Sequence, residues 1–231
     1  MRNDQPDDTH MTLEVIWGSG SPYAWRVLLT LEVKGLGYES RLIQFSRGDH
    51  RSPEHLALSP RGKVPVLRDG DYALSESLAI MAYLDRRYPE PPIFGGSPEE
   101  TGLIWKAIFE FECYVFPLAE RIVAPAFGGR PLDPADMQAA AGELHGELGG
   151  MERIVSARGW LAAERLSAAD LAVYPFVEVL LRAAGKEAVR PMGLGFLPLA
   201  ERYPALEDWR RRVAAVPGYE RTYPPHWRET A

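Results

Sequence analysis

The pattern of apolar and polar positions changes near residue 90. Before it, short apolar runs alternate with stretches in which apolar residues recur at helical spacing. Gly, Pro and Asp residues separate these segments. After it, only long stretches of helical spacing follow. Residues 90–98, EPPIFGGSP, have no periodicity and are typical of a linker. We therefore predict a leader at 1–10, an α/β domain at 11–89, the linker, and an all-helical domain at 99–231.

The first part begins with two strands that flank a helix. Residues 13–17 alternate as a strand does, and 38–44 form the next one. Between them, Ser21 precedes a proline, as an N-cap does before a helix, which we expect at 22–34. A strand, helix and strand of this kind form a parallel pair with a right-handed crossover. Residues 53–58 predict a short helix after it.

The rest of the chain is organised around the stretch from Leu58 to Pro89. It predicts a strand at 64–67, a turn at 68–71 that contains Asp-Gly, and a returning strand at 72–74. A helix then opens at 75–77, with Ile80, Leu84 and Tyr88 on one face. The element order is thus βαβαββα, a mixed sheet with helices on both faces.

Pro65 is unusual in an apolar strand because it removes a hydrogen-bond donor. A cis peptide bond after Val64 would turn the preceding backbone outward, where it could pair with a peptide-like ligand. Glu76 and Ser77 lie where free helix amides suit a carboxylate, and Glu76 could meet an ammonium group. From these residues alone, an edge strand followed by an ordinary Ser-capped helix is the stronger interpretation.

The second part contains helical patterns at 99–123, 134–157, 168–184 and 205–216. Residues 166–171, LSAADL, form a capping box with a hydrophobic staple. The nearly all-apolar helix that follows is the predicted core of this domain. On this basis, Asp170→Ala should cost roughly 1–2 kcal/mol, the upper range for a cap.

The composition of the chain excludes several classes of function. The net charge of −6 argues against a general nucleic-acid binder. The single cysteine, Cys113, excludes an internal disulfide and a cysteine zinc cluster, and we expect it to be a small buried side chain. No apolar run is long enough for a membrane span. Residues 1–10 lack the apolar core of a signal peptide, and Met11 is an alternative start, so a cytosolic location is the default.

The segments SPRGKVPVL and YALSESLAIMAYL, four residues apart, resemble the glutathione-binding half of the cytosolic glutathione S-transferase family. The resemblance continues upstream through SPYAWRVLLTLEVKGLGYE and SPEHLAL, and it reaches the capping box of the helical part. It implies a thioredoxin-like N-terminal domain and an all-helical C-terminal domain. It also implies glutathione as co-substrate, no metal, and a homodimer.

The resemblance gives Ser21 the catalytic role of a hydrogen-bond donor to the glutathione sulfur. A hydroxyl at a helix N-terminus lies in positive potential, which favours a thiolate. Without the resemblance, Ser21 is a plain N-cap, and Ser19 and Tyr23 compete for the role. SPYAWRV is similar to the C-P-F-A segment of the omega class, with Ser in place of Cys, and to the serine-type theta and zeta classes. A serine cannot form a mixed disulfide, which favours conjugation, substitution or isomerisation.

The remaining site follows from the same resemblance. Val64 is expected to pair with the cysteinyl part of glutathione, and Glu76 and Ser77 with its γ-glutamyl end. Lys63 is placed for the glycine carboxylate. His50 matches a theta-like histidine with that role, although a solvated loop histidine explains it equally well.

The second substrate is expected between the domains, where ligand pockets commonly form. We expect Tyr23, Phe109 and Phe116 to form its walls, with further aromatic candidates at Trp17, Tyr223 and Trp227. Arg61 is expected to be a surface charge. This set predicts an apolar electrophile.

The main prediction is a glutathione transferase that directs the thiolate at an electrophilic carbon. Two alternatives stay open: a glutathione-dependent isomerase or dehalogenase, and a non-catalytic interaction module. The presence of Ser21 together with the predicted glutathione residues argues against the module. We predict a homodimer that pairs the first domain with the partner's helical domain. The support for pairing is a set of apolar residues that the core of a single chain is not expected to bury fully. They are Met81, Phe109 and Phe111.

Overall fold

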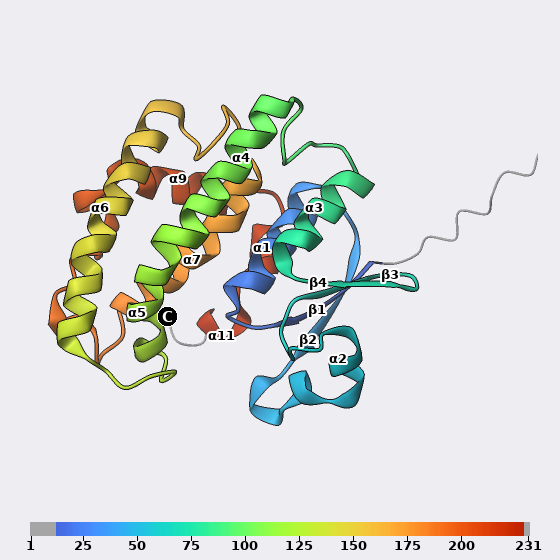
Figure 1. Cartoon of the computed structure of the whole chain (residues 1–231), viewed down its shortest axis with the longest axis horizontal. Coiled ribbons are helices and arrows are strands. Elements are labelled where there is room, and N and C mark those ends of the chain that lie inside the picture. Colours follow the sequence, from blue (N-terminus) through green and yellow to red (C-terminus); the bar gives the residue numbers. More distant parts are fainter. Residues whose placement is uncertain (1–12, 229–231) are drawn as a thin grey trace, which may run out of the picture.

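The computed structural model describes residues 13–228. A small sheet with its helices forms one part of the molecule, and a bundle of longer helices forms the other (Figure 1). The predicted α/β domain followed by an all-helical domain is confirmed. The predicted leader at 1–10 lies outside the described residues.

The sheet has four strands in the order β2-β1-β3-β4, namely β1 (Leu13–Gly18), β2 (Tyr38–Ile43), β3 (Val66–Asp69) and β4 (Tyr72–Ser75). β1 is parallel to β2 and antiparallel to β3, and β4 is antiparallel to β3. The predicted parallel pair around the first helix is therefore present.

The helices of this part are α1 (Pro22–Val33), α2 (Pro53–Leu58) and α3 (Ser77–Arg87), with 3-10 turns at Phe45–Arg47 and Asp49–Arg51. α1 packs against α3 on one side and against the helical part on the other. Two features set its start: Ser21 at the N-cap and the proline after it. α1 is therefore the element that joins the two parts of the chain.

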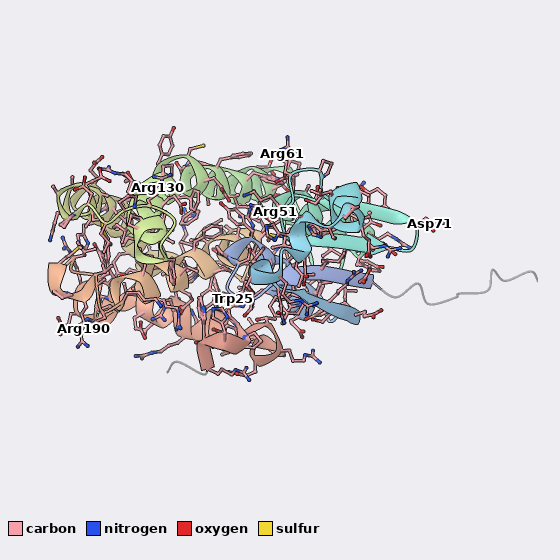
Figure 2. The ribbon with its side chains drawn as sticks, turned by 90° about the horizontal axis from the view of Figure 1, so that it is seen from below. Trp25, Arg51, Arg61, Asp71, Arg130 and Arg190 are labelled. Atoms are coloured by element: carbon pink, nitrogen blue, oxygen red, sulfur yellow. The ribbon has the colours of Figure 1, made fainter. Side chains whose placement is uncertain are left out.

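The central hairpin differs from its predicted boundaries. β3 begins at Val66, two residues later than expected, and continues through Asp69, which we had placed in the turn. Asp69 stays in the strand because it pairs with Leu13 and its carboxylate accepts a hydrogen bond from the Tyr83 hydroxyl at 2.8 Å. The tight turn thus lies at Gly70 and Asp71, and Asp71 marks its tip at one end of the molecule (Figure 2).

The helical part begins with α4 (Pro98–Glu110) and α5 (Phe116–Ala126). The prediction of a single helix at 99–123 is wrong, because a π-helical turn at Phe111–Val115 separates the two. Cys113 lies on this turn and is exposed, so its predicted burial is also wrong. One face of the turn is directed inward, where Phe111 and Val115 are buried, and this leaves Cys113 on the solvent side.

The remaining helices are α6 (Pro134–Arg158), α7 (Ala168–Ala184), α8 (Leu199–Arg202), α9 (Pro204–Ala214), α10 (Tyr219–Thr222) and α11 (Pro225–Arg228), with a 3-10 turn at Arg190–Met192. α7 is buried along almost its whole length and is the core helix, as predicted. It packs against α1, α4, α5 and α9.

The capping box at the start of α7 extends beyond its own turn. The Asp170 carboxylate accepts hydrogen bonds from the Ser167 amide and hydroxyl, each at 2.9 Å. It also accepts the Leu161 amide at 2.9 Å and the Trp209 indole at 2.8 Å. Burial raises the pKa of Asp170, and the four donors act in the opposite direction. Asp170 therefore connects three segments of the helical part.

The stretch between α3 and α4 is held near its middle. Asp85 on α3 accepts the amides of Ile93 at 2.9 Å and Phe94 at 3.2 Å. Lys34, at the end of α1, donates to Asp85 at 2.7 Å and to the Pro91 carbonyl at 2.7 Å. Residues 88–97 contain no helix or strand, yet these bonds fix their course.

The C-terminal segment returns to the first part of the chain. Trp25 on α1 is buried and donates its indole N–H to Thr222 on α10 at 2.8 Å. The ring of Trp227 on α11 meets it edge-on at 5.4 Å. Glu32 on α1 forms an ion pair with Arg221. Trp25, labelled in Figure 2, thus packs α1 against the C-terminal segment.

Asp170→Ala should lower the free energy of unfolding by about 3 kcal/mol, more than an isolated cap, because several buried donors would lose their acceptor. Asp133 is the matched control: it caps α6 at the surface and accepts only the Ala135 and Asp136 amides. Asp133→Ala should cost about 1 kcal/mol. Chemical denaturation compares the two, and equal losses would contradict the wider role of Asp170.

Candidate active site

Two cavities meet at the start of α1. The first, the polar cavity, has a volume of about 300 Å³ and is lined by Tyr23, Arg61, Lys63, Val64, Pro65, Ser75, Glu76 and Ser77. The second, the apolar cavity, has a volume of about 370 Å³ and lies between the two parts of the chain. Tyr23 lines both, so the two cavities are neighbours.

The backbone of Val64 is available for a ligand. Val64 follows the loop and precedes β3, and the Val64–Pro65 peptide bond is cis. Within residues 13–228, neither the N–H nor the C=O of Val64 has a hydrogen-bond partner. The preceding residue is fixed, because the Lys63 carbonyl meets the His55 ring at 2.9 Å and its amide donates to Ser59 at 3.1 Å. Val64 thus offers one donor and one acceptor on a held backbone.

Glu76 adopts a conformation that side chains rarely take. Its φ is 71°, and it is the only described residue other than glycine with a positive φ. It stands at the N-cap of α3, and its side chain extends toward solvent with Arg61 at 3.8 Å. A backbone of this kind costs free energy and is found mainly where function requires it. Glu76 thus directly precedes the free amides of the helix start, and its carboxylate does not cap them.

Ser77 is buried, and its hydroxyl accepts a hydrogen bond from Arg26 Nε at 2.8 Å. The same guanidinium donates to Glu112 on the π-helical turn at 2.6 Å. It also lies over the rings of Tyr23 at 5.2 Å and Phe176 at 5.4 Å. Burial lowers the pKa of Arg26, while Glu112 opposes that shift. Arg26 was not among the predicted site residues.

The three candidate hydroxyls differ in their surroundings. Ser21 Oγ accepts the Ala24 amide at 3.3 Å, and its own proton has no acceptor within residues 13–228. Ser21 itself lines neither cavity, although Gly20 and Pro22 beside it line the apolar one. Ser19 Oγ lies 2.6 Å from Nδ1 of His226. Tyr23 lines both cavities, and burial raises the pKa of its hydroxyl, which keeps it protonated.

The two predicted cations lie in different places. Lys63 lines the polar cavity, and so does Arg61, which is a surface charge as expected, with 79% of its side chain exposed. His50 does not line it. The backbone of His50 approaches the neighbouring loop, since a Cβ on Gly62 would lie 3.0 Å from the His50 carbonyl oxygen. Its Nδ1 is buried and has no partner in the described part of the chain, so it keeps one unused polar atom.

The walls of the apolar cavity are mostly aromatic. Tyr23 and Phe116 both meet Phe176 edge-on, at 5.0 and 5.3 Å between ring centroids. Phe109 lies outside the cavity: it stacks on Trp105 at 5.7 Å, and 55% of its surface is exposed. The π-helical turn explains this difference, because it shifts the helical register between Phe109 and Phe116.

Sequence reasoning did not find several lining residues of the apolar cavity. These include Glu120, Phe127, Phe176, Val179 and His226. Trp227 was expected and is present, whereas Trp17 is buried elsewhere with its indole on Ser40. The positions on α7 had no signal, because nearly every residue of that helix is apolar.

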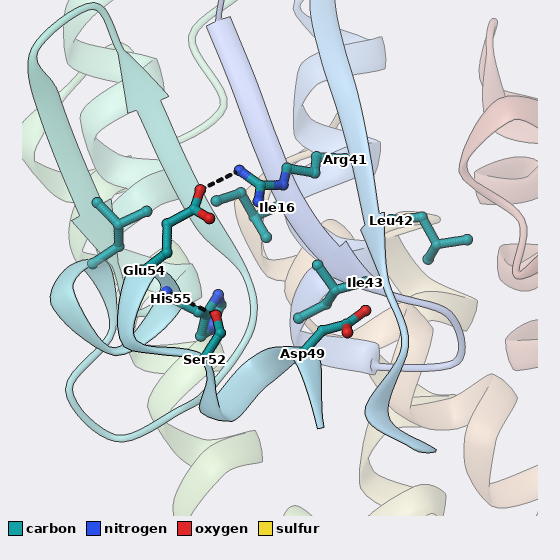
Figure 3. A pocket seen from close by; sticks show the side chains of 9 residues that line it. Ile16, Arg41, Leu42, Ile43, Asp49, Ser52, Glu54 and His55 are labelled. Carbon is teal, nitrogen blue, oxygen red and sulfur yellow. Dashed lines mark hydrogen bonds and ion pairs between the residues drawn. The ribbon is translucent and has the colours of Figure 1, made fainter. Parts of the chain in front are cut away.

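A third cavity of about 320 Å³ is lined mainly by residues of β2 and α2 (Figure 3). Two of its charged lining residues, Arg41 and Glu54, form an ion pair at 2.9 Å. Ser52 accepts the His55 amide at the start of α2. None of the predicted site residues lines it.

Two absences hold for residues 13–228. No helix there is long and apolar enough to cross a membrane. No group of three or more His, Cys, Asp or Glu side chains in that range is arranged to hold a metal ion.

Comparison with known proteins places this chain in a family. The family model for the glutathione S-transferase N-terminal domain matches residues 19–92, and the C-terminal domain model matches 134–212. Glutathione S-transferase F10 of Arabidopsis thaliana is 36% identical over 168 residues, which are 70% of this chain and 78% of the relative. Glutathione S-transferase A of Pleuronectes platessa is 28% identical over 228 residues, 94% of each chain.

The crystal structure of a glutathione S-transferase from the Antarctic clam Laternula elliptica superposes with a TM-score of 0.81 at 30% identity and covers 94% of each chain. The chain therefore belongs to the glutathione S-transferase family. The prediction of a glutathione transferase is confirmed, and the relatives favour neither the isomerase or dehalogenase nor the non-catalytic module.

Proposed function

We propose that this chain binds glutathione in the polar cavity, holds it as the thiolate beside Ser21, and directs the sulfur at an apolar electrophile in the neighbouring cavity. The observation that carries the proposal is the unpaired backbone of Val64, within residues 13–228, in a cavity that shares Tyr23 with the apolar one. A peptide-like ligand pairs with such a backbone as an added strand does.

Each end of glutathione has a matching group in this arrangement. Glu76 and the amides at the start of α3 would hold the γ-glutamyl ammonium and carboxylate. The Ser77 hydroxyl is already bonded to Arg26, so Ser77 would contribute mainly its backbone amide. Lys63 supplies a cation for the glycine carboxylate. His50 lies outside this cavity with its Nδ1 buried, which favours Lys63 for that end.

Ser21 is the residue we assign to the sulfur. Its hydroxyl proton has no acceptor in the described part of the chain, so it can be donated to a thiolate. The adjoining N-terminus of α1 adds positive potential. Ser19 is engaged with His226, and Tyr23 retains its proton and is the main competitor.

Ser21→Ala should leave glutathione affinity nearly unchanged and lower conjugation of chlorodinitrobenzene about 100-fold, the usual loss for one donor to an anion. The thiol pKa of bound glutathione should rise toward its free value of about 8.5. The loss should therefore be largest at neutral pH and smaller at high pH. Tyr23→Phe and Ser19→Ala are the matched controls, each removing one hydroxyl. A larger loss in either control would transfer the role to that residue.

Glu76→Gly should raise the free energy of unfolding by about 1 kcal/mol, because glycine adopts a positive φ without strain. It should also weaken glutathione binding about tenfold or more, because a charge-assisted hydrogen bond is lost. Glu76→Gln retains the strained backbone and should weaken binding without the gain in stability. Calorimetry and chemical denaturation measure the two effects. Wild-type glutathione affinity in Glu76→Gly would contradict the assignment.

The chain is also proposed to act as a homodimer. Two of the residues expected to drive pairing, Met81 and Phe111, are instead buried in the core of the single chain. The apolar residues that remain exposed on α4 are Leu103 and Phe109. They are the surface proposed to meet the sheet part of a second copy. The resemblance to cytosolic transferases supports a cytoplasmic location and a role in detoxification.

Phe109→Asp should convert the protein from a dimer to a monomer by light scattering at micromolar concentration, because a charge would be buried at the interface. Leu132→Asp is the control, since Leu132 is similarly exposed but lies between α5 and α6, in neither α4 nor the sheet part. It should stay dimeric. A monomeric wild-type protein would remove the proposal.

A further inference from the structure

One negatively charged residue lies in the wall of the apolar cavity. On α5 and just after its end, the residues that line the cavity are Phe116, Ala119, Glu120, Val123 and Phe127. Their spacing of three or four residues places them on one face of the helix. Glu120 is therefore the charged position in an otherwise apolar stripe. Among residues 13–228, no other carboxylate lines this cavity.

Glu120 differs from the charged residues around it because it has no partner. The next residue, Arg121, pairs with Asp136 and Glu143 on α6. Glu120 is half-buried, and it forms no hydrogen bond or ion pair with any group in the described part of the chain. A carboxylate in partly apolar surroundings is stabilised by an opposite charge. The wall thus has a place for a cation that the described residues do not supply.

The aromatic rings of the same cavity also attract positive charge. Three cations of the chain already lie over ring faces of this wall, at 4.8 to 5.4 Å from the ring centroids. They are Arg26 over Tyr23 and Phe176, Arg182 over Trp227, and Lys186 over Phe127. Arg26 is neutralised by Glu112 at 2.6 Å. Arg182 and Lys186 oppose the entry of a further cation, but charge interactions weaken with distance, so direct contact with Glu120 outweighs them.

We propose that the apolar cavity takes an electrophile that carries a positive charge, such as a protonated amine, and that Glu120 is the residue that selects it. This inference rests on the proposed function, because the electrophile would meet glutathione bound in the neighbouring cavity. The apolar body of the molecule would pack against the rings, and its cation would lie at Glu120. The same carboxylate would disfavour electrophiles that carry a negative charge.

Glu120 acts on binding and not on the reacting atoms. The thiolate sulfur forms a bond to the electrophilic carbon, and a leaving group such as chloride departs with the electron pair of the bond that breaks. The positive charge of the electrophile is remote from this carbon and does not change during the reaction. A contact made equally in the ground state and the transition state lowers KM and does not raise kcat. Selection by Glu120 should therefore appear in KM.

Two probes of the same shape isolate the effect of charge. Both are 1-chloro-2,6-dinitrobenzenes with a substituent opposite the chlorine. In one the substituent is a trimethylammoniomethyl group, and in the other it is a neopentyl group, in which carbon replaces the charged nitrogen. Dividing kcat/KM by the uncatalysed rate with glutathione removes the difference in intrinsic reactivity. The wild-type protein should then favour the cationic probe about tenfold, between the contributions of exposed and buried ion pairs.

Glu120→Gln should remove most of this preference, through a higher KM for the cationic probe. Glu143→Gln is the matched control: it changes the net charge equally, and Glu143 lies on α6 and lines neither cavity of the site. It should retain the preference. Assays at about 0.15 M salt, where the Debye length is about 8 Å, limit the general attraction of cations to a chain with a net charge of −6.

Three results overturn the inference. They are a wild-type protein without preference for the cationic probe, an unchanged preference in Glu120→Gln, and equal losses in Glu120→Gln and Glu143→Gln, which would attribute the preference to net charge alone. In each case, conjugation of the uncharged probe would leave the proposed function standing. No turnover with either probe or with chlorodinitrobenzene itself would remove the proposed function and this inference together.

Discussion

The buried guanidinium of Arg26 is the interaction on which the geometry of the site depends. It extends from α1 and bonds the first residue of α3 and the π-helical turn between α4 and α5. Two aromatic rings of the apolar cavity lie against it. A buried charge is tolerated only when its donors are satisfied, so these partners are required and not optional. One side chain thereby sets the distance between the backbone that would bind a peptide and the cavity that would take the second molecule.

The π-helical turn is the part of the helical domain that contacts this arginine. It brings Glu112 to Arg26 and buries Phe111 beside Phe176. Turns of this kind occur often at functional sites, because the additional residue rotates the following side chains around the helix axis. Here the rotation separates Phe116, which lines the apolar cavity, from Phe109, which stays at the surface. The position of the cavity wall thus follows from a local irregularity of the backbone.

Local chemistry in the sequence accounts for much of the fold. The Ser-Pro start of α1, the Asp-Gly turn and the capping box of α7 are each specified by a few adjacent residues, and the structure contains all three. Long-range partners had no such signal. Arg26 looked like one more helical residue, and nothing near His226 indicated that it meets Ser19. The π-helical turn was also missed, since its apolar spacing is compatible with a continuous helix. The predicted site was therefore most complete where neighbours in sequence form it, and least complete where the tail and α7 supply the walls.

The fixed path between α3 and α4 has a consequence for how such a chain can change. Lys34, Asp85 and the amides of Ile93 and Phe94 form a single cluster, and the Ile93 carbonyl accepts the Ala168 amide at the start of the core helix. These hydrogen bonds fix the segment that connects the two parts, so it has little freedom to act as a hinge. A chimaera that takes its sheet part from one relative and its helices from another would have to exchange this whole cluster together. Recombination within the family is therefore constrained by four contacts that lie outside both cavities.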